Sequence, residues 1–127
     1  MLSDLHLELS SFTPPLIDVE VVVLSGDIHK GNLGVYGARK AWPDKHLVYV
    51  AGNHEFYRSD RVKTLEKLRF AGNEMNFHFL ENDEAIIDGI RFLGCTLWND
   101  FNLFGTEQQN ACISLATERL NDFTKVS

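Results

Sequence analysis

The stretch VEVVVLSGD at residues 19–27 decides the fold of this chain. Its first seven residues are nearly all apolar and mostly β-branched, which is the pattern of a strand buried on both faces of a sheet. Gly26 allows the backbone to turn sharply where that strand ends. We therefore expect Asp27 on a loop at the carboxyl end of a buried strand, where ligands of open α/β sheets bind.

A second unit of the same kind lies about one strand–helix–strand step further along the chain. Residues 47–51 (LVYVA) form an apolar run, and Gly52-Asn53-His54-Glu55 follows it directly. Upstream, Asp4-Leu5-His6 places a carboxylate and an imidazole two residues apart, on the same side of an extended backbone. The three polar clusters are therefore expected to converge at one edge of the sheet.

The remaining pattern alternates strands and helices before a hairpin and a last helix. Asp88-Gly89 between two apolar runs is a strong signal for a two-residue hairpin. Thr106, with Gln109 three residues on, resembles a capping box at the start of the last helix. The order predicts an α/β layered sandwich with a mixed β-sheet and flanking helices, in one domain spanning residues 1–127. The expected strands are residues 19–25, 47–51, 77–79, 85–87 and 90–93, and the expected helices cover residues 33–42 and begin near residues 59 and 106.

Composition limits the classes of partner and location. The chain is 44% hydrophobic and 24% charged, which suits a globular domain with a real core. Its net charge of -6 argues against nucleic acid as the main partner, because phosphate backbones are bound by Lys and Arg. Neither a membrane span nor a signal peptide is visible, so a cytoplasmic location without a membrane partner is expected. Cys95 and Cys112 have no CxxC neighbour, and free thiols are favoured over a disulfide.

Each cluster offers groups suited to metal-dependent hydrolysis, and the same residues can also be explained by ordinary structural roles. The Asp27 carboxylate can bridge two cations, although a loop Asp also caps helices. Asn53 is a neutral oxygen ligand, or the left-handed residue of a turn. His54 can protonate a leaving alkoxide, with Glu55 orienting the imidazole or holding charge on it. His29 can contact a phosphate, and a plain loop role is equally open.

Together these motifs resemble the calcineurin-like metallophosphoesterase superfamily, whose signature begins D-x-H, then G-D, then G-N-H-[DE]. Here they read Asp4-Leu5-His6, Gly26-Asp27 and Gly52-Asn53-His54-Glu55. The resemblance covers nearly the whole chain, including residues 79–89 and 97–101. It implies a metallo-dependent phosphatase-like fold and hydrolysis of a small phosphomonoester or phosphodiester.

The resemblance also implies roles for particular residues. Asp4 and His6 would bind the first of two divalent ions (Mn, Fe or Zn), and Asp27 would bridge both. Asn53 would bind the second ion. His54 would contact the phosphate, with His29 nearby, and protonate the leaving group, and the metals would activate water for in-line attack.

The chain departs from the family pattern, which continues with a later His and a closing G-H-x-H. Its histidines end at His78, which is expected to be a partly exposed strand residue, and His46 is expected to be exposed to solvent just before a strand. The second metal site is therefore incomplete, and we expect the N-terminal half of a domain, shortened at both ends. The alternative function is a catalytically incomplete fragment that binds at most one metal. It would self-associate as a homo-oligomer through an unpaired sheet edge, or a partner chain would supply the missing ligands.

Overall fold

The structure is a computed structural model, and it describes residues 1–126. The chain alternates strands and helices up to residue 79, then forms a hairpin and ends in two helices. The strands are β1 (Val21–Ser25), β2 (His46–Val50), β3 (His78–Phe79), β4 (Asp83–Ile87) and β5 (Ile90–Gly94). The helices are α1 (Leu33–Ala41), the 3₁₀ helix η1 (His54–Phe56), α2 (Arg61–Glu74), α3 (Thr106–Arg119) and α4 (Asp122–Lys125).

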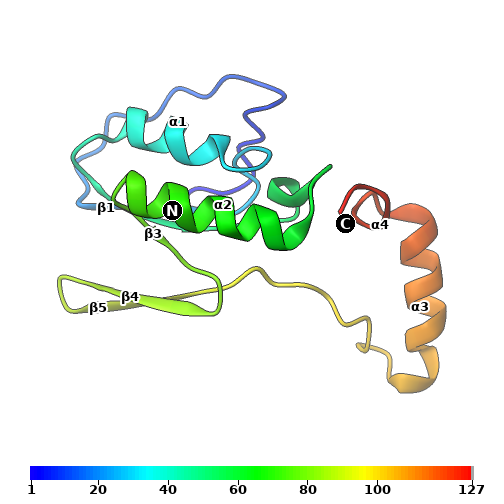
Figure 1. The fold of residues 1–127 in the computed structure, drawn as a ribbon. Coiled ribbons are helices and arrows are strands. Elements are labelled where there is room, and N and C mark those ends of the chain that lie inside the picture. Colours follow the sequence, from blue (N-terminus) through cyan, green and yellow to red (C-terminus); the bar gives the residue numbers. More distant parts are fainter. Residues whose placement is uncertain (127) are drawn as a thin grey trace.

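The centre of the fold is a parallel sheet in the order β1-β2-β3. Helices α1 and α2 cover one face of this sheet, and the antiparallel β4–β5 hairpin covers the other (Figure 1). The predicted layered α/β architecture is confirmed at this level. The prediction of one mixed sheet is wrong, because the parallel and antiparallel strands belong to two separate sheets.

The apolar run of β1 is divided between two cores by the period of two along a strand. Val22 and Leu24 face the helices and join the larger core, whereas Val21 and Val23 pack on the hairpin side. Strand β2 follows the same rule, with Tyr49 toward the helices and Val48 toward the hairpin. The strand predicted to be buried on both faces is therefore confirmed.

The hairpin leaves the parallel sheet through a local turn. Leu80 N donates to Tyr49 O at 2.9 Å, which is the last hydrogen bond to β2, and Asn82 then has φ of 52°. At the tip, Asp88 and Gly89 have φ of 50° and 79°, as a two-residue hairpin turn requires. The chain thus folds back over the sheet face, which is why β4 and β5 form a sheet of their own.

Two helix starts differ from the expected ones. Helix α2 is capped by Asp60, whose side chain accepts from Lys63 N at 2.8 Å, while Ser59 lies one residue earlier. Helix α3 begins at Thr106 itself after Gly105, so the predicted capping box does not form there. Both helices exist as predicted, and the caps differ by one residue.

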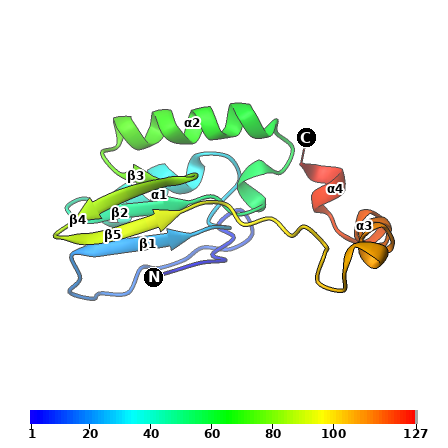
Figure 2. The same cartoon turned by 90° about the horizontal axis from the view of Figure 1, so that it is seen from below.

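The C-terminal arm, comprising α3 and α4, stands apart from the sheet (Figure 2). Only Ala116 of α3 is buried, and this helix packs against α4. The arm returns to the body at its end, where Arg58 N donates to Lys125 O at 2.6 Å and Ser59 forms a parallel bridge with Val126. This return brings α4 beside the loop that follows β2.

The structure also describes the two cysteines and the length and polarity of the helices, which do not affect the site. Cys95 and Cys112 are free and partly exposed, as favoured. Within residues 1–126, the helices are too short or too polar to cross a bilayer.

Candidate metal centre

The loops after β1 and β2 touch at two glycines. A Cβ atom on Gly26, where φ is 85°, would lie 2.9 Å from Gly52 Cα. A Cβ atom on Gly52 would overlap the carboxylate of Asp27. Glycine at both positions therefore allows the Asp27 side chain to rest on the backbone of the neighbouring loop, forming a cradle that a larger residue would fill.

Glu55 links these two loops through hydrogen bonds. Its side chain is fully buried, and the carboxylate accepts from Ile28 N at 2.9 Å, Asp27 N at 3.1 Å and Gly52 N at 2.8 Å. The Tyr49 hydroxyl adds a fourth hydrogen bond at 2.8 Å. Burial raises the pKa of Glu55 although these donors act to lower it, and burial likewise raises the pKa of Tyr49. The expected contact between Glu55 and the His54 imidazole is not formed, because the carboxylate is committed to the backbone of both loops.

The N-terminal segment runs alongside β1 and into the same edge. Leu2 forms a parallel bridge with Leu24, after which Asp4 N donates to Gly26 O at 3.1 Å and His6 N donates to Asp27 O at 3.0 Å. Asp4, His6 and Asp27 have φ of 53°, 44° and 55°. The extended backbone predicted for Asp4 and His6 is therefore wrong. Left-handed backbone of this kind is strained outside glycine and clusters at functional sites.

His6, Asp27 and His54 come together at this edge. One side-chain donor atom from each lies within 4.8 Å of the others. The His54 backbone N–H donates to Asp27 Oδ1 at 3.0 Å, and the Nδ1 atoms of His6 and His54 are 3.2 Å apart. Two imidazoles and a carboxylate are ligands that Zn²⁺, Mn²⁺ and Fe²⁺ accept, so the residues fit a divalent cation.

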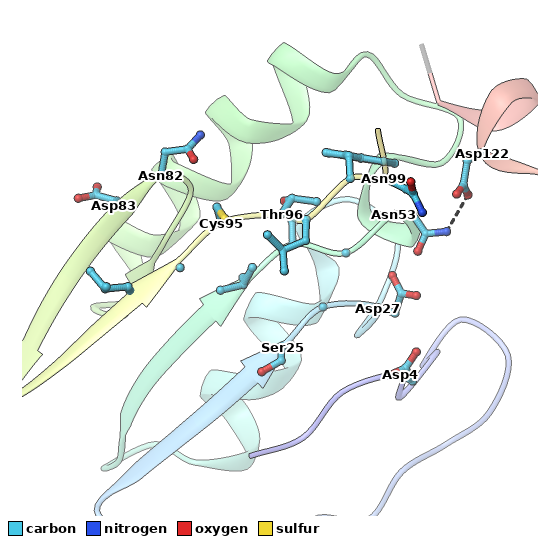
Figure 3. Close-up of a pocket in the computed structure, with 18 of the residues that line it drawn as sticks. Asp4, Ser25, Asp27, Asn53, Asn82, Asp83, Cys95, Thr96, Asn99 and Asp122 are labelled. Carbon is cyan, nitrogen blue, oxygen red and sulfur yellow. Dashed lines mark hydrogen bonds between the residues drawn. The ribbon is translucent and has the colours of Figure 1, made fainter. Parts of the chain in front are cut away.

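On the other side of Asp27 a cleft of about 1110 Å³ opens between the sheet edge and the segment after β5. Its polar rim is a line of oxygen-bearing side chains, namely Asp4, Asp27, Asn53 and Asp122 (Figure 3). Trp98 and Asn99 also line the cleft. Trp98 is 43% exposed, and its ring packs on Phe56 beside the cleft.

The orientation of the Asn53 amide is fixed by two partners. Asn53 Nδ2 donates to Asp122 Oδ1 at 2.7 Å and to the Tyr57 hydroxyl at 3.0 Å. Tyr57 in turn donates to Asp122 Oδ1 at 2.7 Å. Both amide hydrogens are thus used, and Asn53 Oδ1 lies on the side of Asp27 (Figure 3). Burial and the bond to Asp122 raise the pKa of Tyr57 to about 12, so this phenol stays a donor at neutral pH.

Sequence reasoning missed Asp122. It reaches Asn53 from 69 positions away, through an arm whose path depends on tertiary contacts. No local pattern around residue 122 signals that role.

Sequence reasoning also missed Glu8, although Asp4, His6 and Glu8 repeat at every second residue. Glu8 Oε1 lies 2.7 Å from His54 Nδ1 and 3.9 Å from His6 Nδ1. The Glu8 side chain is 7% exposed, and its Oε2 is buried without a hydrogen-bond partner in the described part of the chain. Burial raises the pKa of Glu8, but the hydrogen bond to His54 and the nearby imidazoles outweigh it, so that pKa lies below its ordinary value.

The other histidines differ in placement. His29 is partly buried beside this cluster, with Nδ1 3.3 Å from Lys30 O, and its electrostatic effect reaches Glu8. It is not among the residues that line the cleft in the described chain, so its contact with a phosphate stays a prediction. His46 and His78 are exposed at β2 and β3, as predicted.

Comparison with known proteins gives a likeness of fold. No family model matches the chain, and no curated protein matches it. Among solved structures, it is similar to phosphopantetheinyl hydrolase from Mycobacterium tuberculosis, with a TM-score of 0.73 and 19% sequence identity. The match covers 99% of this chain and 53% of that one, so this chain spans about half its length. The neighbour is a hydrolase, and at this identity the likeness shows the fold alone.

These findings correct the family assignment made from the motifs. The chain was identified as resembling the calcineurin-like metallophosphoesterase superfamily, but no family model matches, and a solved structure similar in fold is named phosphopantetheinyl hydrolase. Three short motifs at strand ends are placed by parallel α/β topology itself, because that topology brings loops to one edge whatever the family. The metallo-dependent phosphatase-like label is likewise not shown, and the supported description is an α/β domain with one parallel and one antiparallel sheet.

Proposed function

We propose that this chain carries a centre for metal-dependent hydrolysis of a phosphate ester, with Asp27 shared between two divalent cations. The observation that carries the proposal is the position of Asp27. It lies between an imidazole-bearing group, His6 and His54, and the oxygen-bearing rim of the cleft. A carboxylate has two oxygens and can serve both sides.

The chain's own residues divide into ligands and a proton donor. His6 and Asp4 would hold the first cation with Asp27, and Asn53 would hold the second through the oxygen left free by its amide hydrogen bonds. Asp122 adds a carboxylate at the rim, next to Asn53. When bound, such cations neutralise phosphoryl oxygens and lower the pKa of water toward neutrality.

His54 is proposed as the group that protonates the leaving oxygen. Its Nδ1 lies 2.7 Å from the carboxylate of Glu8, so this ring nitrogen is hydrogen-bonded to a carboxylate and Nε2 is the nitrogen left to exchange a proton. Its backbone N–H donates to Asp27 Oδ1, so the residue is held next to the carboxylate that would bind the cations. The substrate class is a small phosphomonoester or phosphodiester, since bound cations would offset the acidic rim for an anionic substrate.

The test is hydrolysis of p-nitrophenyl phosphate and bis(p-nitrophenyl) phosphate by the full chain with Mn²⁺, Fe²⁺ or Zn²⁺. We expect turnover that depends on the metal and is lost in Asp27→Asn. In His54→Ala we expect bound metal to be retained while turnover falls by roughly 10²–10⁴-fold for esters with poor leaving groups. Loss of metal in His54→Ala would instead make this residue a ligand.

The competing function from the sequence, an incomplete centre with at most one cation, predicts the opposite result. It gives one bound ion or none, and no turnover of either ester with any of the three metals. Exchange of ligands between protomers would appear as turnover found only in an oligomeric fraction on size-exclusion chromatography.

A further inference from the structure

Glu8 lies outside every motif used above, yet it makes one of the shortest polar contacts at the centre. Its Oε1 is 2.7 Å from His54 Nδ1, the length of a charge-assisted hydrogen bond. The carboxylate is held by burial, with 7% of its side chain exposed, whereas the imidazole is 21% exposed. A buried carboxylate is costly to keep unless it is hydrogen-bonded, and His54 provides that hydrogen bond.

The surroundings of His54 leave one of its two ring nitrogens for chemistry. Its ring stacks on Tyr57 with centroids 4.3 Å apart, and the edge of His6 approaches it at 4.3 Å. Its Nδ1 lies 2.7 Å from Glu8 Oε1 and 3.2 Å from His6 Nδ1, and the shorter contact is the one to Glu8. Because the partner of one ring nitrogen fixes where the proton resides, a proton on Nδ1 leaves Nε2 as the exchanging atom.

We propose that Glu8 is the positioning residue of His54, because its carboxylate pairs with Nδ1 and so fixes the orientation and the tautomer of the ring. This role rests on the proposed function of His54 as proton donor. Glu8 holds the Nδ1 proton, the imidazolium donates its Nε2 proton to the departing oxygen, and the neutral ring is then reprotonated from solvent. The pair therefore supplies the function that the sequence had assigned to Glu55.

Geometry separates this role from that of a metal ligand. Oε1 is 2.7 Å from His54 Nδ1 but 3.9 Å from His6 Nδ1, so the carboxylate is paired with one imidazole rather than centred between two.

The first experiment reads the tautomer without catalysis, by long-range ¹H–¹⁵N NMR of the histidines in the metal-free full chain. His54→Ala identifies the His54 signals. We expect a proton on Nδ1 of His54 in the wild type and a shift toward the Nε2–H tautomer in Glu8→Leu. Glu66→Gln on the exposed face of α2 is the matched control and should leave His54 unchanged. His54 signals that are the same in the wild type, Glu8→Leu and Glu8→Gln would overturn the proposal.

The second experiment measures turnover and metal content of the same variants with Mn²⁺. Glu8→Gln keeps the shape of the side chain, and we expect kcat to fall by roughly 10²-fold for an alkyl or phenyl ester and much less for a p-nitrophenyl ester. KM should change by less than about threefold, since positioning acts on the transition state. Bound Mn²⁺ should stay at the wild-type level.

The outcomes also separate this inference from the function on which it rests. Loss of Mn²⁺ in Glu8→Gln to the extent seen in Asp27→Asn would make Glu8 a ligand and overturn the positioning role. A wild type that turns over neither ester with any metal would end the phosphate-ester proposal. The NMR comparison would still decide whether Glu8 sets the tautomer of His54.

Discussion

The loop cluster (residues 26–29 and 52–55) and the C-terminal arm both present oxygen atoms to the same cleft, but they are held by different forces. The loop cluster rests on the fully buried Glu55, which accepts four hydrogen bonds. The arm buries only Ala116 of α3 and is tied to the body around Arg58 and Ser59. The side of the cleft formed by the loop cluster is thus part of the core, whereas the side formed by the C-terminal arm is joined to the body near the end of the arm.

This difference teaches which ligands are preorganised. Asp27 cannot move without disturbing buried hydrogen bonds, whereas Asp122 can leave Asn53 when a few surface contacts open. We therefore expect a strong effect of substitutions in the loop cluster on folding and metal binding together. Substitutions in the arm should affect the Asn53 side of the cleft with little cost in stability.

The largest effect is expected for Glu55→Ala. Three backbone N–H groups and the Tyr49 hydroxyl would lose their acceptor in a fully buried position, which should lower the free energy of unfolding by roughly 3–5 kcal/mol. Urea denaturation followed by circular dichroism measures this loss. Glu66→Gln serves as the exposed control, and an unchanged midpoint in Glu55→Ala would remove Glu55 from its proposed place in the core.

Gly52→Ala should separate metal binding from the fold. The new methyl group would overlap the Asp27 carboxylate, so we expect Mn²⁺ affinity to fall by at least tenfold and stability by roughly 1–3 kcal/mol. Gly37→Ala in α1 is the matched control, because nothing lies within 4 Å of a Cβ there and the change should stabilise the helix slightly. Equal Mn²⁺ binding by both variants would contradict the close approach of the two loops.

Asp122→Leu tests the side of the cleft that the C-terminal arm provides. It removes the acceptor that orients the Asn53 amide, so the weaker of two Mn²⁺ affinities should fall while the free energy of unfolding changes by about 1 kcal/mol or less. Asp122→Asn keeps an acceptor oxygen and should retain more of that affinity. A parallel loss of both cations would mean that the arm is as integral to the centre as the loop cluster.

Tyr57 gives a smaller effect with a defined pH window. Its folded pKa of about 12 lies above the unfolded value near 10, so its stabilising contribution is complete below about pH 10 and is lost as pH rises through 12. Spectrophotometric titration should show this phenol ionising at a higher pH in the wild type than in Asp122→Leu. Burial still acts in the variant, so only the part of the pKa rise that is due to Asp122 should be lost. A Tyr57 pKa unchanged by that substitution would exclude Asp122 as a cause.

Most of the fold was predictable because its signals are local. The β-branched run of β1 and the Asp88-Gly89 turn fix their own conformations, and both are confirmed. The separation into two sheets was not predictable from such signals. It depends on how the chain leaves Leu80 and turns at Asn82, and on apolar contacts of Val48 with Ala85 and Ile87.

The candidate site divides in the same way. Asp27 and Asn53 follow buried strands, so their place at the sheet edge could be read from the sequence. The left-handed backbone at His6 could not, because it depends on the hydrogen bond from His6 N to Asp27 O. Glu8 was overlooked because only burial and distance reveal its contact with His54.

The most direct test of the central claim is an Mn²⁺ titration of the wild type and Asp27→Asn, followed by electron paramagnetic resonance. Asp27 shared between two cations predicts two ions per chain in the wild type with a spin-coupled spectrum, and loss of the coupled pair in Asp27→Asn. Two uncoupled ions, or the same stoichiometry and affinity in Asp27→Asn, would contradict a shared carboxylate at this sheet edge.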